Sequence, residues 1–317
     1  MLSRRFIRVK VFKVLFSSVH SQNFDQSVAE KELLTSLEKT RQLYFLLLSL
    51  PVALAQYAQN RIDIGLQKYQ PTDQEMHPNL RFVNNRIIAA LEQDKDLQHA
   101  REHGLNWLSQ RAYIKNLYEQ LKEEPYFIEY MNDPQEPDFY TDLKLLQFFF
   151  CNQPDEDQEL YNLLEDQSLY WADDIAYVCN IILAQLAAMK DSRHLPAHPS
   201  LFNNQEDKDF ATTLLAHSLI HYNQYAALIE QFAQNWDLER VAGTDSILIV
   251  MGVSEAVAFS QIPIKVTLNE MVEISKYYST ENSKMFVNGI LDKVIKHLTQ
   301  EGVIAKRGRG LVEKQKK

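Results

Sequence analysis

The chain has 317 residues, is 45% hydrophobic and contains eight glycines, so it is long enough for two domains or for one domain enlarged by an insertion. The low glycine count and the abundance of Leu, Ala, Gln, Glu and Lys predict an all-α protein. The net charge of -9 argues against a nucleic-acid partner unless the charge is unevenly distributed, and the longest apolar run, residues 43–50, is far shorter than the roughly 20 residues of a transmembrane helix.

The first predicted helix covers residues 3–19, with Ser3 as its N-cap. Beyond its first two turns it is apolar on most sides, which predicts a largely buried helix. Arg4, Arg5 and Arg8 precede that section and fall within an arc of roughly 100°. Guanidinium groups at the end of a helical bundle are suited to bidentate binding of phosphate and to stacking on unpaired bases. For three arginines taken alone, the alternative is an exposed basic terminus without a ligand.

The middle of the chain also has helical patterning. We predict a short amphipathic helix over residues 28–38, a long apolar one over residues 41–64 that Pro51 kinks or interrupts, and others over residues 105–122 and 170–189. The apolar segments 43–58 and 175–189 are too extensive for a disordered linker, so we expect them to pack as helices.

The polar segment 191–209 contains two prolines and two histidines and marks the boundary before the C-terminal region. We therefore divide the chain into an N-terminal region at 1–38, an acidic helical insertion at 39–207 and a C-terminal helical region at 208–317. The insertion has fourteen basic and twenty-six acidic side chains, whereas the two flanking regions together have nineteen and sixteen. Any site for a polyanion is expected in the flanking regions, with the insertion facing away from it.

In the C-terminal region, a helix is predicted over residues 210–232, and Trp236 is assigned to the core. A second helix begins near Asn282 or Ser283, either of which can cap it. Phe286 lies off the apolar stripe of this helix, close to its start, where it could stack on an unpaired base. The alternative for Phe286 is packing against Ile290 one turn later.

Four short C-terminal motifs resemble the signature of NusB, a family of bacterial transcription antitermination factors: Asn235-Trp236, residues 262–266, Asn269-Glu270 and residues 286–289. The N-terminal run Arg4-Arg5-Phe6-Ile7-Arg8, with Leu15-Phe16 after it, is similar to the arginine-rich first helix of that family. The resemblance covers about residues 1–38 and 208–317. It implies a NusB-like helical bundle that carries a large helical insertion.

The resemblance also implies a function and a set of contacts. It implies a factor that binds boxA-type single-stranded RNA of ribosomal RNA transcripts together with NusE, the small-subunit ribosomal protein, and that joins NusA, NusG and RNA polymerase in a larger complex. The residues implied at the RNA are Arg4, Arg5, Arg8, Asn282, Lys284 and Phe286, and those implied at NusE are Asp245 and Glu255.

Two implied RNA positions depart from the family pattern. Many relatives have a carboxylate where this chain has Asn282, and the change removes repulsion toward phosphate. Many have a lysine where it has Met285, and Lys284 could compensate for that lost cation. For Asp245, a solvated helix face is the alternative to a partner contact.

An enzymatic function is not expected. His217 and His221 are four residues apart on a predicted helix, but the glutamate of a HExxH zinc site is missing. No Gly-rich phosphate loop or nucleophile elbow is present, so we expect no catalytic residue, metal or cofactor. Two alternative functions remain open, an RNA-binding module linked to ribosomal RNA modification and a protein-only helical scaffold.

The cellular setting is inferred from two features. Cys151 and Cys179 lie in apolar stretches without a CxxC or metal-ligand spacing, so both are expected to be buried free thiols in a reducing compartment. The N-terminal residues lack the long apolar stretch and small-residue cleavage site of a secretory signal. We therefore expect a cytoplasmic protein without a membrane partner.

Overall fold

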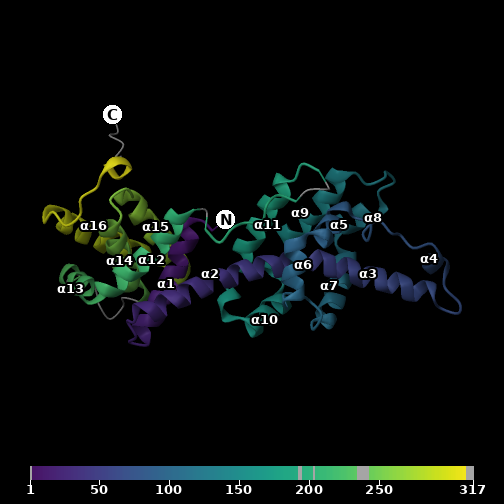
Figure 1. Cartoon of the computed structure of the whole chain (residues 1–317), viewed down its shortest axis with the longest axis horizontal. Coiled ribbons are helices and arrows are strands. Elements are labelled where there is room, and N and C mark those ends of the chain that lie inside the picture. Colours follow the sequence, from purple (N-terminus) through teal and green to yellow (C-terminus); the bar gives the residue numbers. More distant parts are fainter. Residues whose placement is uncertain (1, 192–194, 203, 234–242, 312–317) are drawn as a thin grey trace. The chain divides into compact units, whose positions relative to one another are not determined.

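The computed structural model describes residues 2–191, 195–202, 204–233 and 243–311 (Figure 1). Within these residues the regular secondary structure is entirely helical, which confirms the predicted all-α class. The chain divides into two compact units. We call residues 1–37 with 200–317 the terminal unit, and residues 38–199 the central unit. None of the helices in the described ranges is apolar over enough of its length to cross a membrane.

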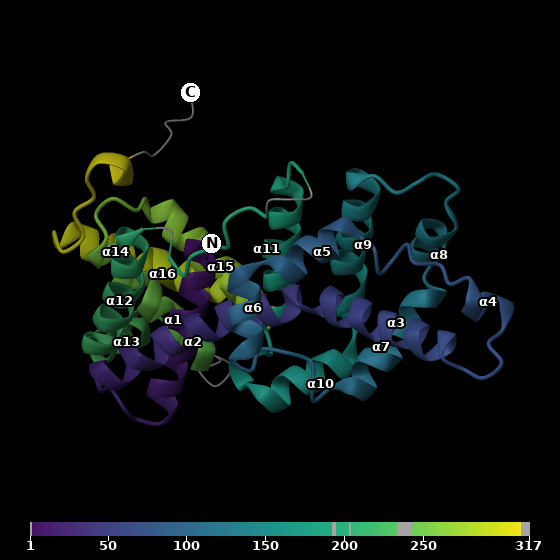
Figure 2. The same cartoon turned by 45° about the vertical axis from the view of Figure 1, so that its right-hand side comes forward.

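The terminal unit packs around one buried helix. Its elements are α1 Arg4–His20, the first part of α2 Gln26–Leu48, α12 Gln205–Ile220, α13 Tyr222–Phe232, α14 Gly243–Ala258, α15 Ile264–Tyr278, α16 Ser283–Gln300 and the 3-10 turn η3 Gly308–Leu311. α14 contacts α1, α12, α13, α15 and α16 (Figure 2). Residues 247–251 are all at most 1% exposed, as expected for a helix that is apolar on every side.

Gly252 allows two neighbours to approach α14 closely. A Cβ atom at this position would lie 2.7 Å from Leu291 Cδ2 and 2.9 Å from Met271 Cγ. Both distances are shorter than van der Waals contact, so a larger residue would force the Leu291 and Met271 side chains to shift. The glycine therefore lets these side chains of α15 and α16 pack directly against α14.

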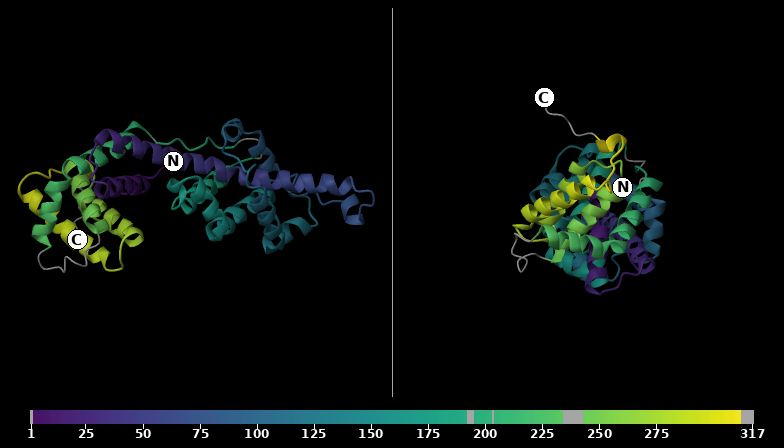
Figure 3. Two further views of the ribbon diagram at one scale, coloured as in Figure 1. Left: turned by 90° about the horizontal axis from the view of Figure 1, so that it is seen from below. Right: turned by 90° about the vertical axis from the view of Figure 1, so that its left-hand side faces the viewer.

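The central unit has its own apolar core. Its elements are the rest of α2, α3 Leu50–Leu66, α4 Asp73–Met76, α5 Arg86–Gln93, α6 Lys95–Glu102, α7 Arg111–Glu123, α8 Pro125–Asn132, α9 Phe139–Glu156, α10 Gln158–Gln167, η1 Leu169–Trp171 and α11 Ile175–Ala188. One cluster of buried side chains extends from Leu43 to Met189. Both apolar segments singled out in the sequence are helical and contribute to this cluster, as predicted. The last turns of α3 extend away from the rest of this unit with the short helix α4 beside them, and Ile64 there is 54% exposed (Figure 3).

Several predicted helix ends are confirmed. α1 begins at Arg4, and Ser3 caps it because its hydroxyl accepts a hydrogen bond from the Phe6 amide at 3.2 Å. The interruption at Pro51 is also present, since α2 ends at Leu48 and α3 begins with this proline in its first turn, where no amide hydrogen is needed.

Other expectations are wrong. α2 is continuous from Gln26 to Leu48, without the predicted break after residue 38. The helix predicted over residues 210–232 is divided at His221 into α12 and α13. Cys179 is buried as expected, but Cys151 is exposed. Trp236, which was assigned to the core, lies outside the described residues.

Candidate nucleic-acid interface

The third arginine of α1 lies inside the terminal unit rather than on its surface. The Arg8 side chain is 4% exposed and forms two hydrogen bonds with Glu255 of α14, from Nε to Oε2 at 2.5 Å and from Nη2 to Oε1 at 3.0 Å. Its guanidinium carbon also lies 5.0 Å from the ring centroid of Phe210. A bidentate pair of this kind fixes the distance and rotation between two helices. Arg8 therefore connects α1 to α14, and its predicted exposure toward RNA is wrong for this structure.

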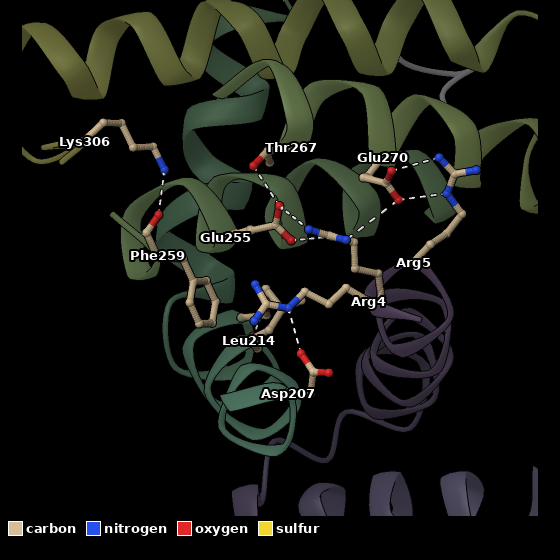
Figure 4. Close-up of polar contacts among 11 residues, drawn as sticks. Arg4, Arg5, Asp207, Leu214, Glu255, Phe259, Thr267, Glu270 and Lys306 are labelled. Carbon is tan, nitrogen blue, oxygen red and sulfur yellow. Dashed lines mark hydrogen bonds and ion pairs between the residues drawn. The ribbon is translucent and has the colours of Figure 1, made fainter. Parts of the chain in front are cut away.

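Glu255 is the other half of this buried pair. It is fully buried, and its Oε1 atom also accepts a hydrogen bond of 2.7 Å from the Thr267 hydroxyl of α15 (Figure 4). A carboxylate with all of these partners has no surface to offer to another protein. The expected role of Glu255 as a partner-binding residue is therefore corrected, because the side chain joins α1, α14 and α15.

The first two arginines of α1 are partly exposed. The Arg4 side chain is 36% exposed, donates from Nε to Asp207 at 2.9 Å and lies 3.4 Å from Glu206. The Arg5 side chain is 55% exposed and donates from Nε and Nη2 to the two oxygens of Glu270, at 2.9 and 2.8 Å (Figure 4). Arg4 lies beside two carboxylates and Arg5 beside one, and both side chains remain partly exposed. They are oriented cations at the end of α1.

The pKa of Glu270 is held below its usual value. The hydrogen bonds from Arg5 lower the pKa of this carboxyl, and the charge of Arg8, whose Nη1 lies 3.8 Å away, acts in the same direction. Partial burial opposes the shift without reversing it. Glu270 is thus an anion at neutral pH that competes with any phosphate for Arg5.

The turn between α15 and α16 is tied to the start of α14. Asp245 is 2% exposed and accepts hydrogen bonds from the Ser279 and Ser283 hydroxyls, at 2.5 and 2.7 Å. These bonds hold the turn that presents Asn282 and Lys284, which are both exposed. Asp245 was predicted to contact a partner or solvent, and the structure instead buries it under this turn.

Phe286 belongs to the core. It is 4% exposed in the first turn of α16, beside Val287 and Ile290, which are fully buried. The alternative of packing within the helix bundle is therefore the one observed. A base could stack on this ring only after a rearrangement of α16.

The carboxylates that hold the arginines were not found from the sequence. Asp207 and Glu270 lie 203 and 265 residues from the arginines that they bind, so no local spacing relates them. For Glu270 the sequence signal is the near balance of thirteen basic and twelve acidic residues in 208–317, which indicates that cations and anions can pair; Asp207 lies just outside this range.

Residues 182–296 match the model of the NusB family. The chain is also 35% identical over 119 residues to the transcription antitermination protein NusB of Salinibacter ruber, and this alignment covers 38% of the chain and 74% of that protein. The chain belongs to the NusB family. It is similar as well to the NusB proteins of Chloroherpeton thalassium, at 38% identity over 106 residues, and of Methylacidiphilum infernorum, at 40% over 93 residues.

The similarity to NusB covers part of each protein. The last two alignments span 33% and 29% of this chain, and 50% and 65% of the relatives. The family match begins within α11 and ends within α16, so it includes the candidate residues of α14 and α16 but not the arginines of α1. No solved structure is significantly similar to the chain.

The paired histidines of this NusB chain form an aromatic stack. The ring centroids of His217 and His221 are 4.4 Å apart, and the Tyr225 ring stacks on both. In the described part of the chain, no three His, Cys, Asp or Glu side chains are grouped to bind a metal ion. Burial, assisted by the charge of His221, lowers the pKa of His217 from 6.5 to about 4.

This shift predicts acid sensitivity of the terminal unit. The unfolded chain takes up a proton at this position as the pH falls below 6.5, whereas the folded chain does so only near pH 4. The contribution of neutral His217 to stability is therefore complete above pH 6.5 and is lost as the pH falls toward 4, by about 1 to 2 kcal/mol after allowance for partial exposure. Urea denaturation across this range should reveal the loss, and the substitution His217→Gln should flatten it. An unchanged pH profile in His217→Gln, with the exposed control His20→Gln behaving alike, would assign the sensitivity to other groups.

Proposed function

We propose that the protein is an RNA-binding transcription antitermination factor. In this proposal it binds boxA-type single-stranded RNA of ribosomal RNA transcripts together with NusE, and it acts with NusA, NusG and RNA polymerase in a larger complex. The observation that supports it most is the pair of partly exposed arginines, Arg4 and Arg5, at the end of the first helix of a NusB-family unit.

The physical case for RNA rests on how these cations are held. Arg5 is fixed by a bidentate carboxylate, so little side-chain entropy is lost when a phosphate approaches its free edge. Asn282, at the N-cap of α16, provides an uncharged polar group, and Lys284, in the first turn of that helix, provides a cation. These four residues are the RNA contacts that we retain, and Arg8 is assigned to positioning the helix that carries two of them.

The central unit is assigned to stability or protein contacts. The segment 39–207 has twelve more acidic than basic side chains, which repel a polyanion at short range. The central unit has a continuous apolar core and is therefore a folded unit, which is what a protein-binding module requires. RNA crosslinks located mainly within this segment would contradict the assignment.

Removal of one arginine tests the proposed RNA site. The substitution Arg5→Ala should weaken binding of a boxA-type single-stranded oligoribonucleotide and lower the slope of log affinity against log salt by about 0.7, the value for one phosphate contact on a single strand. Fluorescence anisotropy at several salt concentrations measures both quantities. Helicity should be unchanged, because Arg5 is on the surface.

Arg111→Ala provides a matched control, since it removes an exposed arginine from the central unit. This variant should retain the salt slope of the parent protein. An unchanged slope in Arg5→Ala as well would exclude α1 from the RNA site.

A further inference from the structure

An aromatic side chain of α15 is exposed near the arginine end of α1. Tyr277 is 82% exposed, the largest value among the described aromatic residues of the terminal unit. It follows Glu270 by seven residues, so it lies on the same face of α15, about 10 Å further along the axis. Because Glu270 binds Arg5 at 2.8 and 2.9 Å, the tyrosine and the guanidinium belong to one surface.

The neighbouring residue fixes the direction of this tyrosine. The ring of Tyr278 packs on α1, with its centroid 5.5 Å from that of Phe12 and 5.5 Å from Lys13 Nζ. Consecutive residues of a helix differ by 100° in direction, so Tyr277 points to the solvent side of this contact.

The acidic residues on this face are neutralised by cations. Glu270 is paired with Arg5, and Glu273 is paired with Lys276 at 2.5 Å. The pKa of Arg5 is raised, chiefly by the hydrogen bonds with Glu270 and more weakly by the charges of Glu273 and Tyr277. The two carboxylates of α15 nearest to Arg5 on this face are therefore each paired with a cation.

We propose that Tyr277 is a base-stacking residue of the RNA site. Its ring accepts an unpaired base from a strand whose phosphates contact Arg5 on one side and Lys284, in the first turn of α16, on the other. An aromatic ring between cations is the usual arrangement for binding single strands, because every base has a face that can stack. The inference rests on the proposed RNA-binding function, and it supplies the exposed aromatic surface that Phe286, at 4% exposure, does not provide.

Tyr277→Ala tests the proposal. This variant should bind a boxA-type single-stranded oligoribonucleotide about 5-fold to 100-fold more weakly, the range for loss of one stacked base. Its salt slope should equal that of the parent protein, because no cation is removed. Tyr277→Phe should retain affinity within about twofold, since it keeps the ring. The melting temperature of both variants should be unchanged, because the side chain is exposed.

An abasic scan of the same RNA separates stacking from other roles. At the position whose base stacks on the ring, removal of the base and Tyr277→Ala should not have additive effects, whereas at other positions the two effects should add. Tyr69→Ala is a matched control, because this tyrosine of the central unit is 97% exposed, and it should bind RNA normally.

The outcomes distinguish the two proposals. If Arg5→Ala lowers affinity and salt slope while Tyr277→Ala has no effect, stacking on Tyr277 is excluded and RNA binding by α1 stands. If neither variant alters binding, both proposals fail. Additive effects at every abasic position, or an equal loss in Tyr69→Ala, would also overturn the stacking role.

Discussion

The substitution Glu255→Gln should lower the free energy of unfolding of the terminal unit by about 3 to 5 kcal/mol. The glutamine can still accept hydrogen bonds, but it leaves the Arg8 guanidinium, 4% exposed, with only the more distant Glu270, 3.8 Å from Nη1, as a compensating charge. Poor compensation of a desolvated cation is the main cost, and the amide NH2 group adds to it because it cannot accept the hydrogen bond that Arg8 Nε donates to Oε2 of the glutamate. Hydrogen exchange of the α1 and α14 amides, with urea denaturation, measures the effect on this unit separately from the central unit.

A double substitution distinguishes this explanation from a simple packing defect. Replacing both partners by apolar residues of similar size, as in Arg8→Met with Glu255→Leu, removes both charges and should recover most of the lost stability. Arg8→Met alone should be about as harmful as Glu255→Gln. If the double variant is as unstable as the sum of the single ones, the buried pair is not the source of the effect.

RNA binding should respond differently to these variants. The double variant keeps Arg4 and Arg5, so once folded it should bind RNA with the salt slope of the parent protein. A slope lowered by one contact would mean that Arg8 leaves Glu255 and reaches the RNA. That result would restore the residue to the set of contacts expected from the sequence.

The features that could be predicted from the sequence are those that depend only on residues close together in the chain. Ser3 caps α1 because its hydroxyl reaches an amide three residues later. Pro51 fits the first turn of α3 because no amide hydrogen is needed there. Such effects are present in any chain with these spacings. The all-α class could be predicted for the same reason, from composition and periodicity.

The environment of the site residues could not be predicted in this way. Helical geometry groups three arginines in one arc but does not determine which of them meets a buried carboxylate, and the partner of Arg8 is 247 residues away. Similarly, separate helices were predicted on the two sides of Thr40, whereas α2 continues through it. This threonine is 1% exposed and donates a hydrogen bond of 2.6 Å to Asp174, a distant contact that no local pattern reveals.

Asn85 connects three elements of the central unit. The side chain is fully buried, and its Oδ1 atom caps α5 by accepting hydrogen bonds from the Ile87 and Ile88 amides at 2.9 and 3.1 Å. Its Nδ2 group donates to the Asp142 carbonyl at 3.1 Å and to the Tyr130 hydroxyl at 3.3 Å. One amide thus satisfies polar groups of α5, α8 and α9 within an apolar core.

Removal of this amide should have a large effect confined to the central unit. Asn85→Ala loses a helix cap, worth about 1 kcal/mol, and leaves a buried carbonyl and a buried hydroxyl with fewer partners, which costs about 1 to 3 kcal/mol more. Asn85→Asp keeps a capping oxygen but has no donor for Asp142 or Tyr130, so it should not restore stability. The exposed neighbour provides the control, since Asn84→Ala should change stability by less than about 0.5 kcal/mol.

Hydrogen exchange measured in both units of Asn85→Ala tests whether the central unit unfolds independently of the terminal unit, which contains the proposed RNA site. Hydrogen exchange should show faster opening of α5, α8 and α9 in Asn85→Ala, while the α14 amides keep their protection. RNA affinity and its salt slope should be unchanged, because the proposed contacts are all in the terminal unit. If α14 loses protection together with α5, the two units unfold as one cooperative structure, and the central unit would have to be included in any account of how this protein binds RNA.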